Sequence, residues 1–210
     1  MRMAKQSNSL FAIALIVGLI LGTNSAPVYA AEKITLVMTE DQVGGYSRSL
    51  FRHWIDADKD GCNTRYEVLI AEAIVKPKVG AGCYLTGGKW KSSYEGKVFT
   101  NPTGLDIDHM VPLAEAWRSG AWAWTAAQRM EFANDLEDSR SLLAVTASLN
   151  RSKGDRDVAG WLPVKAQCAY ISNWIAVKSR FDLTVDPIEG EFLQSKIASC
   201  KITNVVIEGN

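Results

Sequence analysis

Residues 105–112 read Leu105-Asp106-Ile107-Asp108-His109-Met110-Val111-Pro112. Apolar and acidic side chains alternate over the first four positions, and this alternation predicts a half-buried strand. Pro112 cannot donate a hydrogen bond to a strand ladder, but it is accepted in the first turn of a helix. We therefore expect a strand that ends near His109 and a helix that begins near Pro112. A carboxylate and an imidazole then lie side by side where a strand gives way to a loop, a common place for chemistry.

The dipeptide Asp108-His109 has two interpretations. In the first, Asp108 offers a hard oxygen ligand to a divalent metal, and His109 offers a base that titrates near neutral pH. In the second, the histidine merely ends the strand and the aspartate is its surface partner. Because short motifs often arise by chance, the dipeptide alone does not decide between them.

Length and composition indicate a globular protein. The chain has 210 residues, of which 47% are hydrophobic and 22% charged, and its formal net charge is +0. That length is sufficient for one domain with a core of its own. Without a net positive charge, any binding to nucleic acid must come from a local basic patch.

The N-terminus has the features of a secretory signal peptide. Arg2 and Lys5 precede an apolar run from Leu10 to Gly22, and Val28-Tyr29-Ala30 offers small residues for cleavage after Ala30. The run is shorter than the ~20 residues of a spanning helix, although an uncleaved anchor is the alternative. We expect an extracellular or periplasmic protein without a stable membrane anchor after cleavage, and one domain over residues 31–210.

The four cysteines indicate disulfides. None of them forms a C-x-x-C pair and the chain has only two histidines, so a cysteine-rich zinc site is not expected. An even number of cysteines in an exported chain is typical of disulfide bonding. Three pairings exist, and we favour those that join neighbouring segments: Cys62 with Cys83 and Cys168 with Cys200.

The remaining pattern is of mixed helices and strands. We expect a hairpin or small meander over residues 82–100, a compact strand over 141–145 and a short tail at the C-terminus. Capping residues and helical periodicity predict the following helices: 46–55, 64–75 with a capping box from Thr64 to Glu67, 112–119, 126–134, 146–153, 166–180 and 188–200.

The order of these elements, together with several motifs, resembles a known family. The strand that ends in Asp108-His109, an inserted helical stretch, the strand at Leu142–Val145 and the short helix that holds Asn150 resemble the β-β-α-metal core of HNH endonucleases. Further motifs are similar to those of exported HNH-type proteins: Asp60-Gly61-Cys62-Asn63-Thr64-Arg65-Tyr66-Glu67, Gly88-Lys89-Trp90, Asp108-His109-Met110-Val111-Pro112-Leu113 and Asn150-Arg151-Ser152-Lys153-Gly154-Asp155. The resemblance covers most of the chain after residue 30.

The resemblance implies roles for individual residues. His109 matches the general base, Asp108 the first metal ligand, Asn150 the last position of the HNH signature, and Lys153 the basic residue that follows it. The chain departs from the pattern at the middle asparagine. That position falls on Arg140 and Ser141, and Asn134 lies nearby but earlier, so the group that orients His109 is not identified.

The chemistry is consistent with hydrolysis of a phosphodiester. A histidine can take the proton of the attacking water, and a divalent ion held by Asp108 and Asn150, most plausibly Mg²⁺ with Mn²⁺ as the second choice, can neutralise the phosphate. The residues expected to form a positive patch for the backbone phosphates are Arg151, Lys153 and Arg156. The alternative is that Asn150 caps a helix and the basic run is a solvated turn.

The segment from Asp56 to Glu67 is a competing motif. Asp56, Asp58, Asp60 and Glu67 occupy the ligand positions of an EF-hand loop, which would bind Ca²⁺. Asn63 stands where such loops usually have an apolar residue, and Cys62 is expected in a disulfide. The segment can instead be an acidic turn before a helix. In either case Arg65 and Glu67 lie at a helix start and could face the active cleft.

We therefore expect an α+β fold: a ββα-metal, HNH-like core with an inserted helical segment and flanking helices, braced by disulfides. The expected function is a secreted, metal-dependent endonuclease that cleaves DNA, with RNA as a further substrate, and that has little sequence preference. The resemblance implies a 5′-phosphate product. The rival interpretation is a non-enzymatic, calcium-binding exported module, and an inactive descendant of the nuclease family is a third. The oligomeric state is not predicted.

Overall fold

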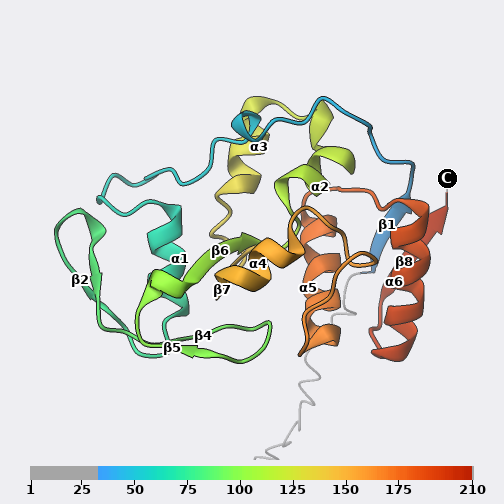
Figure 1. Cartoon of the computed structure of the whole chain (residues 1–210). Coiled ribbons are helices and arrows are strands. Elements are labelled where there is room, and N and C mark those ends of the chain that lie inside the picture. The colour runs from blue at the N-terminus through green and yellow to red at the C-terminus, as the bar shows by residue number, and fades with distance from the viewer. Residues whose placement is uncertain (1–32, 210) are drawn as a thin grey trace, which may run out of the picture. The chain divides into compact units, whose positions relative to one another are not determined.

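Strands β6 (Leu105–His109) and β7 (Leu142–Thr146) form an antiparallel pair at the centre of the fold (Figure 1). The computed structural model describes residues 33–209, so the predicted signal peptide lies outside the described residues. His109 pairs with Leu142, and α2 (Leu113–Arg118) begins directly after Pro112. The strand and the helix therefore begin and end where the sequence predicts.

Helix α4 (Ala147–Lys153) follows β7 without a loop and packs against both strands. Gly154 ends it with a φ of +61°, a conformation that glycine adopts without strain. Between the two strands lie α2, the 3₁₀ turn η4 (Ala121–Ala123) and α3 (Ala126–Ala133). Helix α3 begins with a capping box formed by Thr125 and Gln128. The predicted order of strand, inserted helices, strand and helix is therefore observed.

Helix α1 (Thr64–Glu72) packs against the β6–β7 pair and shares a buried apolar cluster with it. Ile107 of β6 and Ala144 of β7 contribute to this cluster, together with Val68 of α1. Two small antiparallel pairs follow in the predicted hairpin region: β2 (Lys78–Val79) with β3 (Leu85–Thr86), and β4 (Trp90–Lys91) with β5 (Val98–Phe99). The 3₁₀ turns η2 (Ala81–Cys83) and η3 (Pro102–Gly104) connect them to their neighbours.

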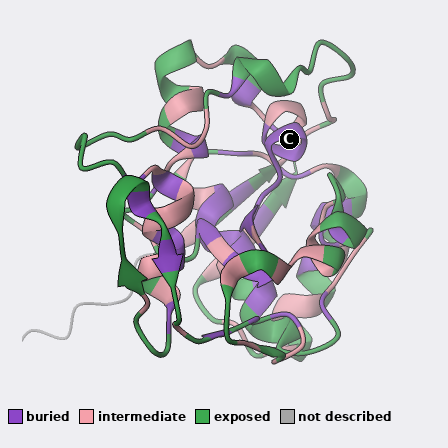
Figure 2. Cartoon of the chain, turned by 60° about the vertical axis from the view of Figure 1, so that its left-hand side comes forward, coloured by how far each residue is buried: buried purple, intermediate pink, exposed green. Residues whose placement is uncertain are grey.

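The larger apolar cluster lies around α5 (Gln167–Arg180), which runs beside α6 (Pro187–Ser199) (Figure 1). Strand β1 (Ile34–Met38) pairs in parallel with β8 (Val205–Gly209), so the two ends of the described chain meet in one small sheet. Figure 2 shows buried residues along the central strands and on the inner sides of the helices. Disulfides Cys62–Cys83 and Cys168–Cys200 are both present, which confirms the predicted pairing.

A buried lysine joins three elements next to the central strands. The Lys178 amine donates to Glu115 and Glu189 at 2.7 Å each and to the Thr184 carbonyl at 2.7 Å. The Arg118 guanidinium also forms an ion pair with Glu115, with 2.7 Å between Nη2 and Oε2. Each of these buried charges has an oppositely charged partner, which offsets the cost of removing it from water. The contacts therefore hold α2, α5 and α6 together.

Three local predictions are wrong. Residues 46–55 form only the 3₁₀ turn η1 (Arg48–Leu50), because the backbone is already extended at Phe51 and Trp54 adopts a positive φ of 59°. Asn63, not Thr64, caps α1, because the Asn63 side chain accepts from the Tyr66 N–H while the Thr64 hydroxyl lies 3.0 Å from the Ile55 carbonyl. The C-terminal residues form β8 rather than a tail, because they find a partner strand at the other end of the chain.

The mixed α and β class is confirmed, with two disulfides. No helix within residues 33–209 has the length and apolar character needed to cross a membrane.

Candidate active site

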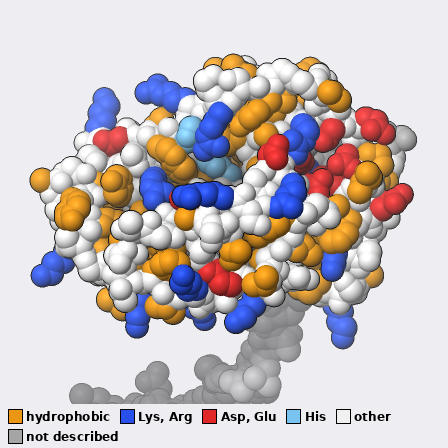
Figure 3. Space-filling view, viewed as in Figure 1, with side chains coloured by type: hydrophobic (Ala, Val, Ile, Leu, Met, Phe, Trp, Pro, Cys, Tyr) orange, Lys and Arg blue, Asp and Glu red, His pale blue; other side chains and the backbone are white. Residues whose placement is uncertain are grey.

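Four of the predicted site residues line one pocket of about 310 Å³: Asp108, His109, Asn150 and Arg151. Strand β6 supplies the first two and α4 the last two, so the packing of α4 on the strand pair forms the pocket. Tyr46 and Arg48, from the segment before α1, also line it. Figure 3 shows the histidine side chains on this face of the molecule, with Lys and Arg side chains beside them.

His109 is almost fully buried, with 6% of its surface exposed. Its Nε2 lies 3.0 Å from the backbone carbonyl of Ala133. Because a carbonyl can only accept, Nε2 carries the proton and Nδ1 has the free lone pair. Trp54 and Phe132 flank the ring, and burial lowers the pKa of His109 to about 3. The imidazole is therefore neutral at physiological pH, as a general base must be.

Asn134 holds the loop that orients His109. Its Oδ1 accepts from the Ile55 N–H at 3.1 Å and from the Thr64 hydroxyl at 2.8 Å, and its Nδ2 donates to the carbonyls of Arg52 and Met130. These bonds fix the residue that follows Ala133 in the chain. The sequence places Asn134 near the expected middle position of the signature but does not show its role, because three of its hydrogen-bond partners come from residues 52–64, far away in the chain.

The two residues at the expected middle position of the signature have other partners. Arg140 forms an ion pair with Asp138 at 2.6 Å, and the Ser141 hydroxyl donates to Asp135 at 2.6 Å. Neither bonds to His109, so Asn134 and the Ala133 carbonyl supply the orientation instead.

The Asp108 carboxylate is held through one oxygen. Its Oδ2 accepts from the Lys153 amine at 2.6 Å and from the Tyr94 hydroxyl. Its Oδ1 has no hydrogen bond from a described residue. Burial raises the pKa of Asp108, and the Lys153 charge opposes this shift. One oxygen is thus fixed while the other stays available in the pocket.

Lys153 does not lie on the surface, and its predicted place in a phosphate-binding patch is wrong. Its side chain is fully buried, and its amine donates to Asp108 and to the carbonyls of His109 and Met110, at 2.7 and 2.8 Å for the two carbonyls. The apolar stem of the Lys153 side chain is accommodated in the core. Its amine donates to three oxygens, and these bonds replace the water that the amine loses on burial. Lys153 therefore fixes the strand end that carries both Asp108 and His109.

Asn150 is not a helix cap, because Thr146 occupies the N-cap position of α4. Its Nδ2 lies 3.4 Å from Oδ2 of Asp106, and no described residue donates to its Oδ1. Asp108 and Asn150 thus each bring to one pocket a hard oxygen, Oδ1, that accepts no hydrogen bond from the described residues. That donor set fits a small divalent cation of the Mg²⁺ type, which prefers oxygen ligands and keeps several waters.

The basic residues of α4 and the loop after it differ in position. Arg151 lines the pocket, its side chain is 76% exposed, and its Nε lies 3.6 Å from Oδ2 of Asp106. Arg156 donates to the Lys153 carbonyl at 3.1 Å and lines a neighbouring pocket that shares Asp155 with the first. Of the three cations predicted to contact the backbone phosphates, Arg151 lines the pocket that holds Asp108 and Asn150, Arg156 lines the neighbouring one, and Lys153 is buried.

Arg65 and Glu67 do not line this pocket, so their predicted place in the active cleft is wrong. The Arg65 guanidinium donates to the Leu105 carbonyl at 2.9 Å. Leu105 begins β6 and His109 ends it, a separation of about 13 Å at the usual rise of a strand. Arg65 thus fixes the start of β6, away from the end that carries Asp108 and His109.

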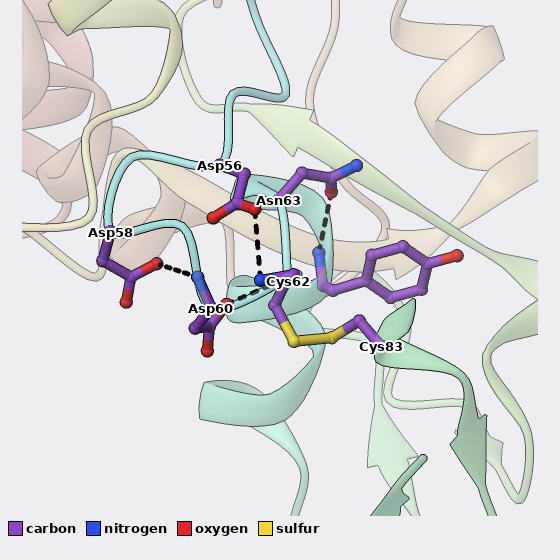
Figure 4. Close-up of a disulfide and its surroundings, with 8 residues drawn as sticks. Asp56, Asp58, Asp60, Cys62, Asn63 and Cys83 are labelled. Atoms are coloured by element: carbon purple, nitrogen blue, oxygen red, sulfur yellow. Dashed lines mark hydrogen bonds between the residues drawn. A yellow bond between two sulfur atoms is a disulfide. The ribbon is translucent and has the colours of Figure 1, made fainter. Parts of the chain in front are cut away.

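The acidic loop before α1 does bring carboxylates together (Figure 4). The side-chain oxygens of Asp56, Asp58 and Asp60 lie within 4.8 Å of one another. Each of them also accepts a backbone N–H, from Gly61, Asp60 and Cys62 respectively. Glu67 joins Asp60 and Cys62 in a second group, and that cysteine is in the disulfide. The loop is therefore a turn whose carboxylates accept hydrogen bonds from its own backbone, and the Cys62–Cys83 disulfide links it to η2.

Comparison with known proteins gives one family and one relative. The family described as GmrSD restriction endonucleases, C-terminal domain, matches residues 65–193, a range that includes Asp108, His109 and Asn150. A protein of Arthroderma benhamiae described as an uncharacterized secreted protein is 43% identical over 158 residues, which cover 74% of this chain and 76% of that protein. No solved structure matches.

Proposed function

Because the chain belongs to the family of the GmrSD restriction endonuclease C-terminal domain, we propose that it is an exported, metal-dependent endonuclease of the HNH type. The family itself suggests a nuclease-type function. The observation that carries the finer proposal is the single pocket that holds Asp108, His109 and Asn150. Strands β6 and β7 with α4 would then be the ββα-metal core that the resemblance implies.

His109 is the general base of the proposed reaction. Nδ1 takes a proton from the attacking water, while the Ala133 carbonyl holds the ring through Nε2. The lowered pKa keeps the base unprotonated, although it also limits its strength as a proton acceptor. The neighbouring rings of Trp54 and Phe132 keep bulk water away from the imidazole.

Asp108 and Asn150 are the proposed metal ligands. When bound there, Mg²⁺ or Mn²⁺ would supply the positive charge that stabilises the scissile phosphate and the leaving oxygen. Lys153 and Tyr94 fix Asp108 through Oδ2 and leave Oδ1 for that role. Arg151, beside Asn150, is placed to contact a backbone phosphate.

The proposed substrate is DNA, with RNA as a further substrate, and the product carries a 5′-phosphate as the family resemblance implies. Little sequence preference is expected, because the sequence shows no zinc module of the kind that reads bases. Export is supported by the apolar N-terminal run, by the two disulfides and by the similarity to a protein described as secreted.

Calcium binding at Asp56–Asp60 is the second candidate. The short distances among the three carboxylates favour it. The hydrogen bonds that each carboxylate already makes, and the disulfide at Cys62, are less favourable to it. A calcium-dependent rise in thermal stability that disappears in Asp58→Asn, in a protein without nuclease activity, would support this candidate over the enzyme.

The test is digestion of plasmid DNA by the oxidised chain from residue 31 to residue 210, with Mg²⁺, Mn²⁺, Ca²⁺ or EDTA. We expect cleavage that EDTA abolishes and that falls about 10²–10⁴-fold in His109→Ala. Asn150→Ala should need more metal for the same rate, whereas the matched change Asn173→Ala on α5 should not. Folded wild-type protein that is inert with every metal would contradict the proposal.

A further inference from the structure

Tyr46 presents an aromatic ring at the edge of the proposed active site. It lines the pocket and keeps 37% of its surface exposed. Phe51 and Trp117 support the ring from within, with centroid distances of 6.2 and 6.4 Å. The Trp117 indole is fixed in turn by its hydrogen bond to the Gly44 carbonyl at 2.9 Å. Tyr46 is therefore a supported ring with a free surface, the feature on which a nucleobase stacks.

Arg48 presents a cation to the same pocket. Its Nη2 lies 3.5 Å from Nε2 of His53, and no carboxylate of a described residue lies within ion-pair distance of it. The other charged side chains that line this pocket are paired: Asp108 with Lys153, Arg151 with Asp106 and Asp155 with Arg118. Among the described residues that line the pocket, Arg48 is therefore the guanidinium with no carboxylate partner. A guanidinium suits phosphate oxygens.

The catalytic groups lie deep relative to these two side chains. Asp108 and His109 are only 5% and 6% exposed, and the pocket volume of about 310 Å³ is at the lower end for small-ligand sites. A pocket of this size has room for about one nucleotide unit. A base inside an intact duplex is already stacked, and bringing it out costs a few kcal/mol.

We propose that Tyr46 and Arg48 bind one nucleotide of the substrate, with Tyr46 stacking on its base and Arg48 contacting the scissile phosphate, so that the enzyme prefers single-stranded nucleic acid. This inference rests on the proposed function and specifies its substrate class. A single strand reaches the pocket without loss of base pairing, whereas a duplex must first open. Arg48 is then a catalytic residue contributed by a segment about 60 positions before the ββα unit.

The experiment compares initial rates on one labelled 20-nucleotide sequence as single-stranded DNA, single-stranded RNA and blunt duplex DNA, with Mg²⁺ and Mn²⁺. We expect a higher kcat/KM on the single strands. Tyr46→Ala should lower kcat/KM on single strands by about 5- to 150-fold, mainly through KM, and Tyr46→Trp should retain it. Arg48→Ala should lower kcat about 10²-fold on every substrate, with partial recovery in Arg48→Lys.

Two control variants lie outside the pocket. Tyr84 is 69% exposed and Lys78 is exposed, and neither lines the pocket, so Tyr84→Ala and Lys78→Ala should cleave as the wild type does. Equal or faster cleavage of the duplex, or an unchanged single-strand rate in Tyr46→Ala, would overturn the inference while leaving the nuclease function intact.

A binding measurement separates the two proposals. Fluorescence anisotropy with the single-stranded 20-mer should show tighter binding to wild type than to Tyr46→Ala. If the protein binds this strand through Tyr46 but cleaves no nucleic acid, the proposed function fails and the binding site stands. If it neither binds nor cleaves, both are wrong.

Discussion

The Lys153 amine and the Asp108 carboxylate form a buried ion pair, with 2.6 Å between Nζ and Oδ2. Helix α4 contributes the cation and strand β6 the anion, so the pair joins the two elements that form the proposed active site. Both side chains are almost fully buried, and the Lys153 amine also bonds to the carbonyls of His109 and Met110. The contact therefore orients the Asp108 carboxylate and fixes the backbone that carries His109.

Replacing Lys153 with Met should destabilise the protein by about 3–5 kcal/mol, because it leaves the buried Asp108 carboxylate without its cation and two carbonyls without a donor. Urea unfolding followed by circular dichroism measures this change. The exposed Lys97 provides the matched control, and Lys97→Met should change stability by less than about 1 kcal/mol. A Lys153→Met protein of normal stability that has lost only nucleic-acid affinity would instead support the surface phosphate role.

Asn134→Ala should lower kcat by about 10²-fold with little change in KM. The change removes the bonds to Ile55, Thr64, Arg52 and Met130, so the neighbouring Ala133 carbonyl no longer holds His109 in one position. Steady-state kinetics on an oligonucleotide measures the two constants separately. Asn173→Ala is the control, and an unchanged kcat in Asn134→Ala would show that the loop does not orient the base.

Stability should depend on pH through His109. Its pKa of about 3 in the folded protein lies below the ordinary value of 6.5, so the unfolded chain binds a proton more readily. The contribution of His109 is therefore complete above pH 6.5 and is lost as pH falls toward 3, by about 1.4 kcal/mol per pH unit. The difference in unfolding free energy between wild type and His109→Gln should shrink over that range. A constant difference would mean that His109 is accessible to protons.

Glu72 should make the stability of the protein depend on pH in the opposite direction. Burial raises its pKa to about 7 from the model-peptide value of 4.5, against the hydrogen bond that its Oε2 accepts from Ala144 N–H at 2.8 Å. The folded state then holds a proton that the unfolded state releases, so stability falls as pH rises from 4.5 to 7. Glu72→Gln keeps the acceptor without the charge. It should be more stable than wild type by up to ~3 kcal/mol at pH 8 and equal to it at pH 4.5.

Removing the Cys62–Cys83 disulfide in Cys62→Ala/Cys83→Ala should cost about 3 kcal/mol, since the link closes a loop with a sequence separation of 21. Denaturant unfolding under oxidising conditions measures the cost. The variant lacking Cys168–Cys200, with a separation of 32, should lose a similar amount. If a reductant changes neither the stability nor the nuclease rate of the wild type, the disulfides do not brace the fold.

The sequence alone determined the features that depend on neighbouring residues. Alternation and proline chemistry predicted the strand ending at His109 and the helix after Pro112, and both are observed. The helix that begins at Ala126 and the two disulfide pairs were also predicted correctly. These features follow from local backbone preferences and from cysteines close in the chain, so no tertiary information was needed.

The tertiary structure decided where charged side chains lie and what they bind. Lys153 is a charged residue in the last turn of α4, a position that is usually exposed. The residues around it in the sequence therefore give no sign that it is buried against Asp108. Asn134 fixes the residue next to Ala133 through partners 70 to 82 positions away, and β8 forms by pairing with β1 at the other end of the described chain. Such contacts depend on the desolvation of particular groups and on long-range pairing, and neither leaves a periodic pattern in the sequence.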